Sequence, residues 1–173
     1  AGTGGAALAH NVACYPYTTK TVCAEGEESG TYVLGVTIPA NQKYVAGTFD
    51  QYTFPMVAVS DNDELTFKNV CGILKLQLKG SQKVASVKLE GNAGEPVAGS
   101  ASISAFADGR VPSLRMSDEA EKAITLKCGQ GVQLDQDLSE EFLMVVPPVL
   151  FNEGFTVTVT DVNGDQYAFK SAR

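Results

Sequence analysis

A stretch of alternating apolar and polar residues, Glu64 to Glu90, constrains the fold more than any other part of the chain. It reads ELTFKNVCGILKLQLKGSQKVASVKLE, with Gly80-Ser81-Gln82 near its middle. The apolar positions that recur with a period of two are Leu74, Leu76, Leu78, Ala85, Val87 and Leu89. Such alternation is typical of half-buried antiparallel strands. The stretch therefore predicts two strands joined by a short polar connection.

Further short runs of strand-forming residues lie on both sides of this stretch. They are Thr31 to Ile38, Phe54 to Val59, Val97 to Ala105, Ala123 to Cys128, Glu141 to Pro147 and Phe155 to Asp161. Asp108-Gly109 and Asn163-Gly164 favour hairpin turns, and the second is typical of type I′. In all, about ten strands at spacings of about eight to twelve residues, without a long helix, predict an all-β antiparallel sandwich or barrel.

The length of 173 residues suits one domain with a substantial core, and we expect residues 1–173 to form a single β-sandwich. Residues 1–14 are small and Gly-rich at their start and are expected to be a flexible terminus. Pro112 to Glu121 predicts one helical turn or a loop, and Gly129-Gln130-Gly131 predicts a turn after a strand. The chain begins at Ala1 without a signal-like segment, which favours a processed or trimmed piece of a longer protein.

The charge balance disfavours nucleic acid as a partner. The chain has 13 basic and 20 acidic residues and a formal net charge of −7, whereas nucleic-acid recognition requires a basic surface. Anionic membrane surfaces are disfavoured for the same reason. The longest apolar run, Phe142 to Phe151, is interrupted by two prolines and is too short to span a bilayer.

Four cysteines, Cys14, Cys23, Cys71 and Cys128, permit three pairings. In an oxidising compartment, a Cys14–Cys23 bridge closes a short loop and stabilises the fold by about 3 kcal/mol, and a Cys71–Cys128 bridge closes a longer loop. Four buried thiols are the alternative. No CxxC spacing occurs and His10 is the only histidine, so a zinc site has little support.

No combination of residues predicts catalysis, a metal or a cofactor. Ser60-Asp61-Asn62-Asp63 has too few spaced oxygen ligands for calcium, and Asp161, Asn163 and Asp165 lack the remaining ligands of an EF-hand loop. The serines at alternate positions from Ser100 to Ser104 have no histidine in sequence to activate them. We therefore expect a protein that is not an enzyme.

Several short segments of the chain resemble the fimbrillin-like proteins of Bacteroides-type bacteria. The main one is Leu65 to Gly80 (LTFKNVCGILKLQLKG). Others follow the same order, from Tyr15-Pro16-Tyr17 through VTIPANQ, PMVA, GNAGEPVAG and ITLKCGQGV to Gly154–Gly164 (GFTVTVTDVNG). The resemblance covers nearly the whole chain, and its specificity lies in the order of the segments.

The resemblance implies a transthyretin-like β-sandwich and a non-enzymatic surface protein, either a fimbrial subunit or an adhesin. It implies a lipoprotein-type location at the outer membrane of a Gram-negative bacterium, with other fimbrial subunits or surface ligands as partners. Members usually have further strand-forming sequence before the Tyr15-Pro16-Tyr17 entry and further sequence beyond the tail. We therefore expect either a trimmed fragment or a sandwich with an incomplete sheet edge that accepts a strand of another chain.

A glycan-binding module of a polysaccharide uptake system is the alternative function. The chain has no Trp, and the side chains available for stacking on sugars are Tyr15, Tyr17, Tyr32, Tyr44, Tyr52 and Tyr167. Aromatic residues in a sandwich lie more often in the core than on a binding surface.

Overall fold

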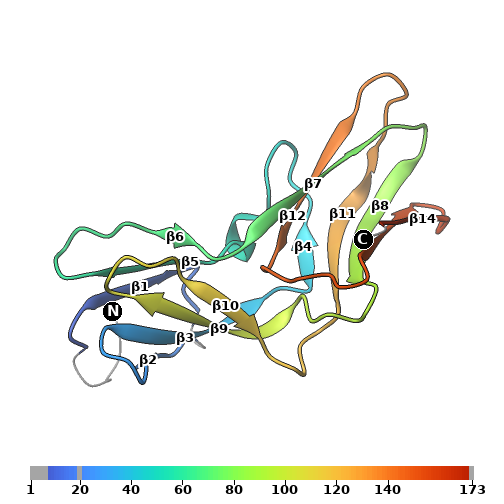
Figure 1. Ribbon diagram of the computed structural model, residues 1–173. Helices are drawn as coiled ribbons and strands as arrows, with labels where there is room; N and C mark the ends of the chain where they lie inside the picture. The colour runs from blue at the N-terminus through green and yellow to red at the C-terminus, as the bar shows by residue number, and fades with distance from the viewer. Residues whose placement is uncertain (1–7, 19–20, 172–173) are drawn as a thin grey trace.

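The computed structural model describes residues 8–18 and 21–171, and these form strands with irregular connections (Figure 1). The strands are β1 (Asn11–Tyr15), β2 (Cys23–Glu25), β3 (Thr31–Ile38), β4 (Asn41–Lys43), β5 (Met56–Ser60), β6 (Lys68–Asn69), β7 (Gly72–Leu78), β8 (Lys83–Gly91), β9 (Gly99–Phe106), β10 (Ser113–Met116), β11 (Ala123–Gln133), β12 (Glu140–Val146), β13 (Phe155–Asp161) and β14 (Gln166–Lys170). One 3-10 turn, η1 (Gln51–Thr53), is the only helical element in the described ranges, and no helix there is long and apolar enough to cross a membrane. The predicted all-β antiparallel sandwich architecture is confirmed.

The strands form two pairs of sheets, which we call the first and second lobes. In the first lobe, sheet β1-β5-β6 faces sheet β10-β9-β3-β2. Between them lies a cluster that includes Tyr32, Leu34 and Ile103, all at most 2% exposed. In Figure 1 this lobe occupies the left half of the molecule.

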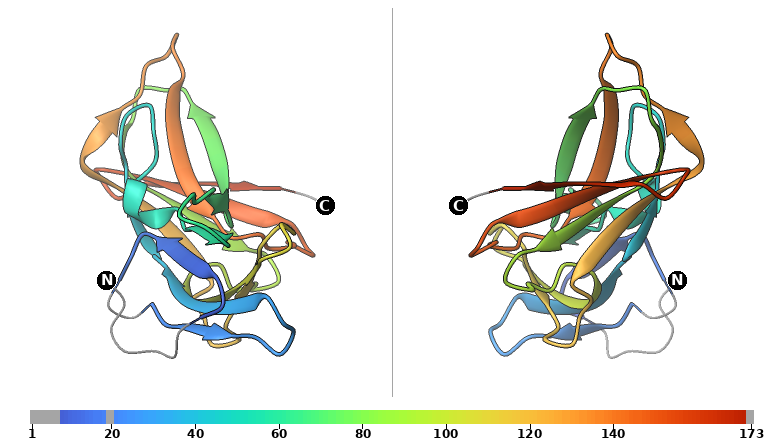
Figure 2. Two further views of the ribbon diagram at one scale, coloured as in Figure 1. Left: turned by 90° about the vertical axis from the view of Figure 1, so that its left-hand side faces the viewer. Right: turned by 90° about the vertical axis from the view of Figure 1, so that its right-hand side faces the viewer.

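The second lobe pairs sheet β14-β13-β8-β11-β4 with the two-stranded sheet β12-β7. Its core is the largest in the protein and includes Val87, Leu126 and Phe142, each fully buried. All pairings in both lobes are antiparallel except the short parallel contact of β4 with β11. Figure 2 shows β14 running steeply across the direction of β7 and β12.

The two lobes alternate along the chain. The chain leaves the first lobe after β3 to form β4, returns for β5 and β6, and crosses again before β7, β9 and β11. A small cluster of Ile38, Ala101, Met116 and Ala120, with Val149 packed against it, lies where these crossings meet. No single cut of the chain therefore separates the lobes, and the sequence pattern does not distinguish two packed sheet pairs.

The orientation predicted for the central stretch agrees with the structure except at Ala85, because a bulge in the pairing of β8 with β13 places Val84 in the core instead. The two strands of the stretch do not pair with each other. Leu74, Leu76 and Leu78 pack on the second-lobe core, as the alternation indicates. However, β7 pairs with β12, whereas β8 pairs with β11 and β13. The polar connection after β7 therefore carries the chain from one sheet to the facing sheet.

Other local predictions require correction. Residues 11–14, expected in a flexible terminus, form most of β1, because Val12 and Cys14 pack on the first-lobe core; residues 1–7 of that prediction lie outside the described residues. Ser113–Met116 pairs with β9 as a strand, where a helical turn or loop was expected. Gly129 and Gly131, with φ of 57° and 93°, form a bulge inside β11 and do not end it.

The hairpin predicted at Asn163-Gly164 is present between β13 and β14, but the type I′ turn is wrong. Type I′ requires positive φ at both central residues, and among the described residues only glycines have positive φ. The Gly164 N–H donates to the carbonyl of Asp161, and the Asp161 N–H donates to the carbonyl of Asp165. This is a three-residue connection with Gly164 (φ 94°) in the left-handed region.

Candidate functional site

His10, Asp61 and Asp161, which were considered for metal roles, have structural partners. His10 contacts the Tyr32 hydroxyl through Nδ1 (2.6 Å) and Asp61 through Nε2 (2.9 Å). Asp161 accepts hydrogen bonds from the N–H groups of Asn163 and Asp165 in its own turn. Within residues 8–18 and 21–171, no three His, Cys, Asp or Glu side chains gather in a way that would hold a metal ion.

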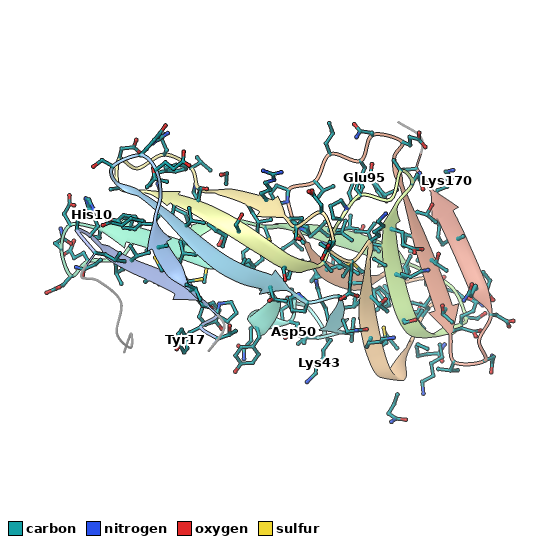
Figure 3. All side chains as sticks on the ribbon, turned by 90° about the horizontal axis from the view of Figure 1, so that it is seen from below. His10, Tyr17, Lys43, Asp50, Glu95 and Lys170 are labelled. Carbon is teal, nitrogen blue, oxygen red and sulfur yellow. The ribbon has the colours of Figure 1, made fainter. Side chains whose placement is uncertain are left out.

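The tyrosines do not form one sugar-binding platform. Tyr32 is 1% exposed in the first-lobe core, and Tyr44 packs at 5.2 Å from the ring of Phe142 in the second lobe. Three tyrosines have exposed rings, but they lie on different elements: Tyr17 follows β1, Tyr52 is in η1 and Tyr167 is in β14. Figure 3 places Tyr17 on the first-lobe side of the molecule and Lys170, at the end of β14, at the opposite end.

The cysteines divide between the lobes, and all four are unpaired thiols in the structure. Cys14, Cys23 and Cys71 pack against the first-lobe core, whereas Cys128 is buried in the second-lobe core. The Cys71–Cys128 pairing therefore does not fit this fold. Burial raises the pKa of the Cys71 thiol to about 12 and that of Cys128 to about 11.

The feature that stands out as a binding site is the outer edge of β7. This strand has β12 on one side, and no described strand pairs with its other side. Its partner β12 lies toward β4, because the buried Gln42 side chain of β4 bonds to β12. Gln42 donates from Nε2 to the carbonyl of Val145 (2.7 Å) and accepts from the Val145 N–H (2.9 Å).

The two hydrogen bonds between Gln42 and Val145 show which main-chain groups of β7 point to its free edge. Both groups of Val145 point away from β7, and Val145 lies directly opposite Ile73. In an antiparallel pair, opposite residues that do not bond each other both point outward. The N–H and C=O groups of Ile73, Lys75 and Gln77 are therefore directed at the open side of β7.

An apolar groove of about 350 Å³ lies at the end of this edge formed by Gly72, Ile73 and Leu74. Its lining joins the start of β7 to the end of β12, the following Pro147-Pro148 segment and strands of the facing sheet. The lining residues are Gly72, Ile73, Leu74, Leu89, Val146, Pro147, Pro148, Val149, Phe151 and Phe155. Phe151 and Phe155 contact each other with ring centroids 5.5 Å apart.

The facing sheet extends beyond the cover that β7 and β12 provide. Phe169 lies opposite Val157 and Tyr167 lies opposite Val159. Directly opposite residues of adjacent strands share a face, so both rings are on the face that carries the core. Yet Phe169 is 58% exposed and Tyr167 is 40% exposed, while Val157 and Val159 are buried.

The outer face of the β7–β12 sheet is apolar at Ile73, Leu143 and Val145 and polar at Lys75, Gln77 and Glu141. Lys75 forms an ion pair with Glu141 of β12, and Gln77 donates to the same carboxylate at 3.1 Å. These hydrogen bonds, from Lys75 first and then Gln77, lower the pKa of Glu141 below its usual value. A Lys on an edge strand disfavours indiscriminate pairing of edges.

The incomplete edge that the family resemblance implied could not be located on β7 from the sequence. The alternating leucines predicted the strand, whereas its pairing with β12 involves residues far along the chain. The two-residue period of Tyr167 and Phe169 is visible in the sequence and was the available signal for the uncovered face.

Comparisons of the chain with protein-family models, with curated proteins and with solved structures find no match.

Proposed function

We propose that this chain is a non-enzymatic assembly or adhesion module of a bacterial cell surface, and that it binds another protein by accepting one of its strands at β7. The observation that carries the proposal is the free edge of Ile73, Lys75 and Gln77 beside an apolar groove. An added strand gains affinity from main-chain hydrogen bonds and specificity from alternate side chains.

The groove defines the chemistry of the strand that it accepts. One face of an added strand lies over Leu74 and Phe155 and extends toward the exposed rings of Tyr167 and Phe169. That face requires apolar side chains at alternate positions. The other face lies beside Lys75 and Gln77 at the surface and requires polar side chains.

The resemblance to fimbrillin-like proteins supports the same assignment. It favours a strand from another fimbrial subunit as the occupant and the outer membrane surface of a Gram-negative bacterium as the location. The net charge of −7 suits a solvated surface protein. The glycan-binding alternative has less support, because the exposed tyrosines lie on separate elements.

The test compares Lys75→Pro with Lys75→Ala in the full-length protein made at the cell surface. The Lys75 N–H points to the open side, so proline removes a docking donor without removing a bond to β12. Both variants lose the ion pair with Glu141, which makes alanine the matched control.

Native size of the surface assemblies is the readout. We expect Lys75→Ala to assemble like the wild type and Lys75→Pro to accumulate as single subunits with an unchanged fold by circular dichroism. Equal assembly of both variants would refute docking at β7. Binding of the monomer to an array of glycans, together with equal assembly, would favour the glycan-binding module.

A further inference from the structure

Cys14 and Cys23 lie on the outer strands of the two sheets that form the first lobe. Cys14 is in β1, at one end of the order β1-β5-β6, and Cys23 is in β2, at one end of the order β10-β9-β3-β2. The contact of His10, just before β1, with Tyr32 of β3 places β1 on the same side of the lobe as β2 and β3.

The strand register directs both thiols into the lobe. Cys14 lies opposite Val57, and Cys23 lies opposite Leu34. Val57 and Leu34 are each 2% exposed, and opposite residues share a face. Accordingly, both cysteines pack against the same hydrophobic cluster.

The titration of Cys14 agrees with this placement. Burial raises the pKa of both thiols, and the charge of the Cys23 thiolate raises the pKa of Cys14 further. An effect of the Cys23 charge on Cys14 requires that the two groups be near each other.

Neither of the other cysteines competes for this pairing. Cys71 follows β6, which is separated from β1 by β5 within its sheet. Cys128 is buried in the core of the second lobe.

We propose that Cys14 and Cys23 form a disulfide that joins the two sheets of the first lobe through their outer strands. The oxidant is a disulfide, either of a thiol–disulfide oxidoreductase or of oxidised glutathione. One cysteine thiolate attacks this disulfide and releases its first thiolate, and the second cysteine thiolate then attacks the mixed disulfide and releases the other. The cysteines are oxidised to one S–S bond, and the oxidant is reduced to two thiols that take up the two protons.

Thiol counting and peptide mapping test the proposal on the reduced wild-type chain after equilibration in a glutathione buffer at an oxidising ratio. We expect two of the four thiols to resist alkylation under denaturing conditions, and a digest to link Cys14 with Cys23. The melting temperature should rise by about 5 to 10 °C over the reduced chain.

Cysteine-to-alanine variants provide the controls. Cys71→Ala and Cys128→Ala should retain the linked peptide, and Cys14→Ala should lose it. Four alkylated thiols in the oxidising buffer, or a linked peptide that contains Cys71, would overturn the proposal. The mapping of the wild-type chain gives this answer even where a variant does not fold.

Discussion

At the scale of single residues, Gln42 occupies the position that a neighbouring strand would take beside β12. Its amide bonds both main-chain groups of Val145 in a fully buried setting, and Gln42 is only 1% exposed. Nothing in the sequence around Asn41–Lys43 marks this residue as buried, because its partner is about a hundred positions away in the chain. A buried polar side chain of this kind is set by tertiary pairing alone.

Gln42→Met removes both hydrogen bonds while it keeps the length of the side chain. We expect the free energy of unfolding to fall by about 2 to 4 kcal/mol, because the N–H and C=O of Val145 lose their partners in a buried site. Urea unfolding measures the change. Gln77→Met, on the exposed face of β7, is the control and should change it by less than about 0.5 kcal/mol; equal effects would contradict the role of Gln42.

Tyr44 provides a second link to β12, through the hydrogen bond that its hydroxyl donates to Glu140. Partial burial, and then this bond and the charge of Glu140, raise the pKa of Tyr44 to about 12 from its usual 10. Because the folded pKa is the higher one, the stabilisation is complete below pH 10 and is lost as the pH rises through about 12.

We therefore expect Tyr44→Phe to weaken the dependence of stability on pH in that alkaline window. Thermal unfolding at a series of pH values measures the slope, and the ultraviolet absorbance of phenolate should show the loss of the tyrosine titration near pH 12. Tyr52→Phe, at an exposed ring, is the control. An unchanged alkaline slope in Tyr44→Phe would contradict the raised pKa.

At the scale of elements, the strands themselves could be predicted and their partners could not. The alternation of β7, β8 and β13 appears in the sequence with nearly the observed bounds, because one face of each strand packs on a core. Periodicity says which face is apolar, but it does not say which strand lies alongside. Hence the sequence indicated neither the pairing of β7 with β12 nor the bulge of Gly129 to Gly131.

In the edge hairpin β13–β14, the contribution of a residue to stability depends on whether other elements bury its side chain. The alternation of apolar residues in the sequence does not reveal that burial. Val157 and Phe169 are opposite each other on one face, but only Val157 is buried. We expect Phe169→Thr to leave the unfolding free energy of the isolated chain within about 0.5 kcal/mol of the wild type. Val157→Ala should lower it by about 2 kcal/mol.

The Phe169→Thr variant also distinguishes a loss of docking from a loss of folding stability. Phe169→Thr should weaken assembly at the cell surface, since it removes an exposed ring beside the groove. A Phe169→Thr protein that assembles like the wild type would show that the uncovered face takes no part in binding.

At the scale of the whole molecule, the second lobe is asymmetric: five strands in one sheet face two in the other. On the side of β4, Gln42 and Tyr44 bond to β12 and close the lobe. On the side of β13 and β14, the groove and the exposed rings of Tyr167 and Phe169 remain open. The strand pattern predicted the fold class and the family resemblance implied an incomplete edge, whereas the location of that edge depends on the packing of both sheets.

Amide hydrogen exchange of β7, resolved by residue, tests the docking of a strand most directly. In the isolated chain, the amides of Ile73, Lys75 and Gln77 should exchange fast, while those of Leu74 and Leu76 are protected by β12. In assemblies taken from cells that display the full-length protein, we expect the amides of Ile73, Lys75 and Gln77 to become protected as well. Fast exchange of Ile73, Lys75 and Gln77 in those assemblies would contradict it.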